Sequence, residues 1–109
     1  MKLEIGDKMY ELEYTVNSVC DLEEITGKGL GDILSVSGLS SIRALLWSGL
    51  IENLPGLTIK KAGAIVQEFL KQGTLEDLVT KIGEAIEQAG FLNAQTAPKR
   101  AAKAVRAVK

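Results

Sequence analysis

The chain has 109 residues, of which 46% are apolar and 25% charged, and this composition predicts one ordinary globular domain. Its single cysteine cannot form an internal disulfide, and the lack of histidine excludes the usual zinc-binding patterns. No apolar run approaches the ~20 residues that cross a bilayer, and the N-terminus has no signal-peptide pattern. We therefore expect a cytoplasmic protein without a metal, a cofactor or a membrane contact.

Charge is distributed unevenly along the chain. Residues 1–93 carry 14 acidic and 8 basic side chains, whereas residues 94–109 carry five basic side chains and no acidic one. We interpret 1–93 as a single domain and 94–109 as a basic, flexible, solvated tail. The alternative is that the tail binds nucleic acid or an acidic partner and forms a helix on contact.

Residues 2–14 have the pattern of a β-hairpin. Apolar and charged residues alternate on both sides of Gly6 and Asp7, and glycine suits a turn position with positive φ. With that turn, Leu3 lies opposite Tyr10. One face then carries the apolar side chains of Leu3, Ile5, Tyr10, Leu12 and Tyr14. A lone hairpin is only marginally stable in water, so this face must pack on the segments that follow.

The rest of the domain has the spacing of helices, with apolar residues recurring at intervals of three and four. Helices are expected over residues 17–26, 40–54, 58–72 and 74–89, with a short helix at 29–36. The expected N-caps are Asn17 or Ser18, Ser40, Thr58 and Thr74, and the expected helix-ending glycines are Gly27 and Gly73. The predicted fold class is α+β, mainly α, with an N-terminal β-hairpin followed by about four helices in a small bundle.

The first predicted helix contains a cysteine and three acidic residues that could take part in chemistry or binding. Cys20 lies on its apolar face without a histidine or a second cysteine, which favours a buried small hydrophobe over a nucleophile. Asp21, Glu23 and Glu24 are interpreted as solvated acids in the first turns, and the alternative is a surface for a basic partner. The "GKGLG" stretch that follows is interpreted as a helix stop and restart, because it lacks the spacing of a phosphate-binding loop.

Three stretches together resemble a known family. They are "MKLEIGDKMYELEYTVNSVCDLEEITGKGLGDIL", "IRALLWSGL" and "PGLTIKKAGAIV", and they span residues 1 to about 90. This part of the chain resembles the small tail assembly chaperones of long-tailed bacteriophages and prophages. Where similar proteins often have an acid-rich "LTLEEVG", this chain has "LTIKKAG".

The resemblance implies a non-enzymatic function. Proteins of this family keep the tape measure protein, a long helix-rich chain, soluble until tail tube protein polymerises around it. The expected partners are therefore the tape measure protein and the tail tube protein. The expected location is the bacterial host cytoplasm and not the mature virion. In many such phages a translational frameshift also produces a longer form, which would make the basic tail the end of the unextended form.

The residues themselves favour the same kind of function. Without histidine, a metal-binding set or a nucleophile paired with a base, we expect no catalytic, cofactor-binding or metal-binding residues. A helical domain rich in apolar residues acts by presenting a groove to an amphipathic helix. Exposed apolar surface also predicts a homo-oligomer, because self-association covers that surface until a client binds.

Candidate partner-binding residues lie on the two central helices. Tryptophan is enriched at binding hot spots, so Trp47 is a candidate anchor, and the alternative is that Trp47 packs against the hairpin. The candidate residues are Trp47, Leu50, Leu54, Phe69 and Leu70.

A rival interpretation treats residues 40–72 as a helix-turn-helix that binds DNA. Lys60 and Lys61 begin its second helix, 58–72, and that helix and the basic tail would contact phosphates. The acidic body argues against this interpretation, and so does the scarcity of base-reading side chains beyond Gln67.

The interpretation of the tail yields a first testable prediction. Deleting residues 94–109 should leave the thermal unfolding midpoint nearly unchanged, because a solvated basic tail contributes little burial. Differential scanning fluorimetry of both chains measures the midpoints. A loss of several degrees on deletion would show that the tail packs on the domain.

Overall fold

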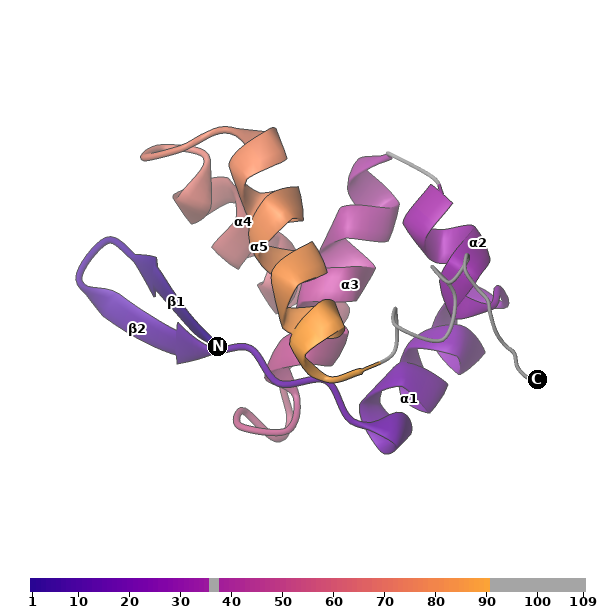
Figure 1. Cartoon of the computed structure of the whole chain (residues 1–109). Helices are drawn as coiled ribbons and strands as arrows, with labels where there is room; N and C mark the ends of the chain where they lie inside the picture. The colour runs from indigo at the N-terminus through magenta and orange to yellow at the C-terminus, as the bar shows by residue number, and fades with distance from the viewer. Residues whose placement is uncertain (36–37, 91–109) are drawn as a thin grey trace.

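A computed structural model describes residues 1–35 and 38–90 of the chain. Within them, a two-stranded antiparallel hairpin precedes five helices (Figure 1). The strands are β1 (Lys2–Ile5) and β2 (Lys8–Glu11), and the helices are α1 (Val16–Thr26), α2 (Leu30–Ser35), α3 (Leu39–Leu50), α4 (Ile59–Phe69) and α5 (Leu75–Gln88). The predicted fold, α+β and mainly α, is confirmed. The predicted tail, 94–109, lies outside the described residues.

Helix α3 lies at the centre of the molecule. It packs against α4, α1 and α5, while the hairpin contacts α3 through β2 and α4 through β1 (Figure 1). The buried residues of α3 occupy several of its faces: Ile42, Ala44, Leu45, Leu46, Ser48, Gly49 and Leu50. A helix that is apolar on several faces requires neighbours on several sides, and this explains its central place.

The hairpin has the predicted register. Leu3 pairs with Tyr10 across β1 and β2, and Gly6 occupies the turn with a φ of 62°. The predicted apolar face rests on the helices, with Tyr10 half-buried and the other four side chains buried. The Gln72 side chain holds the turn in place, because it accepts a hydrogen bond from the Gly6 N–H at 2.7 Å and donates one to the Glu4 carbonyl at 2.8 Å.

Tyr14 joins the end of the hairpin to α3. Its hydroxyl donates a hydrogen bond to the Leu45 carbonyl at 2.6 Å, and burial raises the pKa of this phenol above its ordinary value. Its ring lies against the backbone at Gly49, where an added Cβ would fall 2.6 Å from the ring Cζ. The neighbouring Glu13 N–H donates to the Gly49 carbonyl at 2.8 Å. This close approach requires a residue without a side chain at position 49.

The helix N-caps differ from the prediction at two of four places. Thr15, not Asn17 or Ser18, caps α1, and Ser18 instead completes a capping box by accepting a hydrogen bond from the Thr15 N–H. Gly38, not Ser40, precedes α3 and makes no side-chain cap. The predicted caps Thr58 and Thr74 are confirmed, each accepting a hydrogen bond from the third residue of its helix.

Two helices end earlier than predicted. Helix α3 stops at Leu50 rather than at residue 54, because the chain turns before Pro55, and Gly56 follows with a φ of 90°. Helix α4 stops at Phe69 rather than at residue 72, and the last predicted residues form a turn. As predicted, Gly27 ends α1 with a φ of 72°.

The face that α1 buries also differs from the prediction. Ser18, Val19 and Leu22 are buried, whereas Cys20 is exposed, so the prediction of a buried cysteine is wrong. Ser18 tolerates burial because its hydroxyl is hydrogen-bonded within the capping box. This leaves α1 with a narrow contact stripe toward α3.

The acidic cluster of α1 lies beyond its first turn, because the helix already starts at Val16. Asp21 and Glu24 are exposed, while the Glu23 carboxylate accepts a hydrogen bond from the Leu30 N–H at 2.8 Å. Glu23 therefore fixes the start of α2 from the preceding helix. The predicted helix stop and restart over "GKGLG" is confirmed.

The contact between Tyr14 and Gly49 yields a stability prediction. Gly49→Ala should lower the free energy of unfolding by about 1–3 kcal/mol, because the new Cβ displaces a buried, hydrogen-bonded ring. Gly83→Ala in α5 is the matched control, since its Cβ meets no atom within 4 Å and alanine favours the helix. Urea denaturation measures both. Equal stability of the two variants would contradict this account of Gly49.

The α5 capping box yields a prediction about pH. The pKa of the Asp77 carboxyl is held below its ordinary value of about 4. The largest cause is the hydrogen bond from the Thr74 backbone N–H, and the second is the hydrogen bond with the Thr74 side chain. A lowered pKa in the folded state stabilises the protein above that ordinary value, and the stabilisation is lost as the pH falls. The urea midpoint of the native chain should therefore exceed that of Asp77→Asn at pH 6, with the gap narrowing below about pH 4. A gap independent of pH would contradict this role.

Candidate partner-binding site

The five predicted partner-binding residues do not form one surface. Leu50 and Phe69 are only 0% and 5% exposed, so their side chains belong to the core and cannot reach a partner while the fold is intact. The prediction that Leu50 and Phe69 bind a partner is therefore wrong. Helical periodicity identifies apolar positions but does not distinguish core from surface. Leu54 and Leu70 are exposed, the first in the turn after α3 and the second just after α4.

Trp47 is half-buried and is held by a contact within the chain. Its indole N–H donates a hydrogen bond to the Leu57 carbonyl at 2.8 Å. This bond ties the connection between α3 and α4 back onto α3, instead of joining α3 to the hairpin. A partner would therefore meet only the exposed part of the ring.

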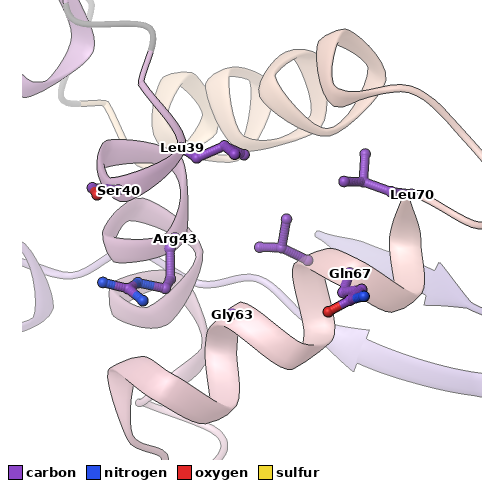
Figure 2. Close-up of a pocket in the computed structure, with 7 residues that line it drawn as sticks. Leu39, Ser40, Arg43, Gly63, Gln67 and Leu70 are labelled. Atoms are coloured by element: carbon purple, nitrogen blue, oxygen red, sulfur yellow. The ribbon is translucent and has the colours of Figure 1, made fainter.

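An open groove of about 360 Å³, the α3–α4 groove, lies between these two helices (Figure 2). It is lined by Leu39, Ser40, Arg43, Gly63, Val66, Gln67 and Leu70. Leu39 is 59% exposed and Leu70 is 42% exposed, while Val66 is buried. Figure 2 shows these two leucines, Leu39 at the start of α3 and Leu70 just after α4, at the same end of the groove. The groove thus has apolar walls supplied by two helices.

The other end of the α3–α4 groove is basic. The aliphatic part of the Arg43 side chain on α3 lies close to Gly63 of α4, because an added Cβ at position 63 would lie 3.0 Å from the arginine Cδ. The guanidinium group points away from Gly63 (Figure 2). Arg43 is exposed, and so is Lys60, which lies one helical turn before Gly63. Among the described residues that line this groove, none is acidic.

A second groove of about 330 Å³ lies between α2, α3 and α5, and we term it the α3–α5 groove. It is lined by Leu34, Ser35, Ile42, Leu45, Leu75, Glu76, Val79, Ile82 and Gly83. Val79 is 46% exposed, and Glu76 is the charged residue in the lining. The two grooves lie on different sides of α3 and differ in the sign of their charge.

Of the exposed residues that line the two grooves, Leu70 is the one predicted from the sequence to bind a partner. The predicted Ser40 cap leaves Leu39 outside the helix, and Arg43 carries no apolar signal. The exposed Val79 recurs at helical spacing with the buried Ile82 and Ile86, and nothing in that periodicity marks it as exposed. No local signal in the sequence separates these exposed residues from the buried ones, because coverage depends on tertiary packing.

The part of the chain that the structure describes offers neither a metal site nor a membrane-spanning helix. Within residues 1–35 and 38–90, no group of three or more acidic or cysteine side chains is placed to hold a metal ion. None of the helices in this part of the chain combines the length and apolar character needed to span a bilayer. Comparisons with protein-family models, with curated proteins and with solved structures find no match.

Proposed function

We propose that this protein is a non-enzymatic phage tail assembly chaperone that binds helical segments of the tape measure protein and keeps them soluble. The observation that carries the proposal is the α3–α4 groove, where Leu39 and Leu70 present apolar surface to solvent. The identity of the client comes from the sequence resemblance, and the groove offers a means of binding it. The hairpin followed by helices is the architecture predicted from the residue pattern of the same stretches that carry the resemblance.

The groove suits an amphipathic helix because it offers apolar contact along two neighbouring helices. Burying the exposed parts of Leu39 and Leu70 contributes about 2 kcal/mol each, from the ~25 cal/mol per Å² of apolar surface removed from water. Such weak binding is compatible with a client that must later be released to the tail tube. A helix lying in the groove would present its apolar stripe at intervals of three and four residues.

The second groove increases the strength with which a long client is held. The α3–α5 groove offers a further apolar contact through Val79. Two weak contacts on one domain raise the overall affinity for a client with many helical segments, because the second contact forms at high effective concentration. Contact with tail tube protein, homo-oligomer formation and action in the host cytoplasm belong to the same proposal.

DNA binding remains the alternative function. Lys60 and Lys61 are both exposed at the start of α4, as a helix-turn-helix would require of residues that contact phosphates. Glu68 on the same helix is also exposed and would oppose a phosphate backbone. Salt dependence separates the two functions, since counterion release weakens DNA binding steeply, whereas apolar burial is little affected.

Co-expression with the tape measure protein tests the proposal. The wild-type chain should keep that protein in the soluble fraction and co-purify with it through moderate salt. Leu70→Asp should reduce the co-purified amount several-fold, because it places a charge in the apolar wall of the α3–α4 groove. Val16→Asp is the matched control, since Val16 is 67% exposed on α1 and lines neither groove.

Circular dichroism should show native helix content for both variants. Equal solubility of the tape measure protein alone, or equal co-purification by the two variants, would contradict the proposal. Retention of duplex DNA with a steep salt dependence would favour the alternative.

A further inference from the structure

Arg43 places a positive charge at one end of the α3–α4 groove. Its aliphatic stem lies over Gly63, which has no side chain to displace it. Its guanidinium group forms no ion pair or hydrogen bond with the residues that the structure describes. Arg43 thus presents an exposed cation beside an apolar groove, with its stem close to Gly63.

Two further features add positive charge at this end. Lys60 is exposed one turn before Gly63, and it too has no carboxylate partner among residues 1–35 and 38–90. The N-terminus of α4, capped by Thr58, adds the positive end of the helix dipole. Lys71 differs, because it pairs with Glu68 at 3.0 Å near the other end of α4. The groove is therefore cationic at its Arg43 end and apolar at its Leu39 and Leu70 end.

The α3–α5 groove has the opposite charge. Glu76 lies in its lining, and the exposed Glu87 lies one helical turn after Gly83, another lining residue. A ligand with acidic residues is therefore repelled from this groove and attracted to the α3–α4 groove. This contrast indicates that the grooves bind segments of different charge.

We propose that the α3–α4 groove selects an amphipathic helix whose apolar stripe is flanked by acidic residues at the end that meets Arg43 and Lys60. The inference rests on the proposed function and specifies the class of client helix. Leu39 and Leu70 contact the apolar stripe, while Arg43 and the nearby exposed Lys60 fix its direction along the groove. Arg43 is suited to this role because a guanidinium forms two parallel hydrogen bonds with a carboxylate.

Two synthetic peptides test the inference directly. Each is an amphipathic helix of about 18 residues with the same leucine stripe, and the residues flanking one end are glutamate in one peptide and lysine in the other. Fluorescence anisotropy at low salt should show that the glutamate peptide binds the wild-type protein about five-fold more tightly. The preference should shrink as salt rises, because the charges are exposed, while the leucine-dependent binding remains.

Variants assign the preference to Arg43. Arg43→Glu should abolish or reverse the preference, while Lys81→Glu, an exposed change of equal charge on α5, should leave it intact. Gly63→Ala should weaken the preference without loss of helix, because the new Cβ displaces the arginine stem and alanine favours a helix. Leu70→Asp should weaken both peptides alike, which locates them in the α3–α4 groove.

The outcomes separate this inference from the proposed function. Equal binding of the two peptides, with a loss on Leu70→Asp, would overturn the charge selection and leave the helix-binding function standing. A preference lost on Val79→Asp would place the site in the other groove and also overturn the inference. Displacement of the glutamate peptide by duplex DNA would show that the cations bind phosphates instead. Failure of the wild type to bind either peptide overturns the inference, and co-expression then decides the proposed function.

Discussion

The close approach of Tyr14 to Gly49 is the constraint on which the rest of the structure depends. The ring occupies the space where any other residue at position 49 would place its Cβ, and the tyrosine hydroxyl is satisfied by the Leu45 carbonyl. Ser48 donates to the same carbonyl at 3.1 Å, so this part of α3 accepts two buried hydrogen bonds. The contact anchors the segment between the hairpin and α1 onto the central helix.

Once that segment is fixed, the other elements have defined positions around α3. The chain leaves the hairpin beside the end of α3. There Thr15 caps α1, and its hydroxyl donates a hydrogen bond to the Glu52 carboxylate at 2.8 Å. On the far side of the hairpin, Gln72 bonds the turn to the α4–α5 connection. The hairpin and the segment after it therefore cover one side of α3. The surfaces between α3 and α4 and between α3 and α5 remain open as grooves.

Most of the fold could be predicted from the sequence because its signals are local. Alternation around Gly6 predicts the hairpin, and threonines before apolar stripes predict the starts of α4 and α5. The site was less predictable, because which apolar residue is covered depends on tertiary packing. Phe69 and Leu70 are adjacent in the chain, yet one is in the core and the other in a groove wall. The exposure of Cys20 and the capping of α1 by Thr15 likewise depend on how the hairpin meets α1.

The central claim is that a client helix lies in the α3–α4 groove. Methyl nuclear magnetic resonance spectra recorded during titration with a fragment of the tape measure protein test this claim most directly. The account predicts that the methyl signals of the exposed Leu39 and Leu70 shift together, while those of the buried Leu22 and Leu46 stay in place. Shifts confined to other surfaces, or no shift at saturating fragment, would contradict it.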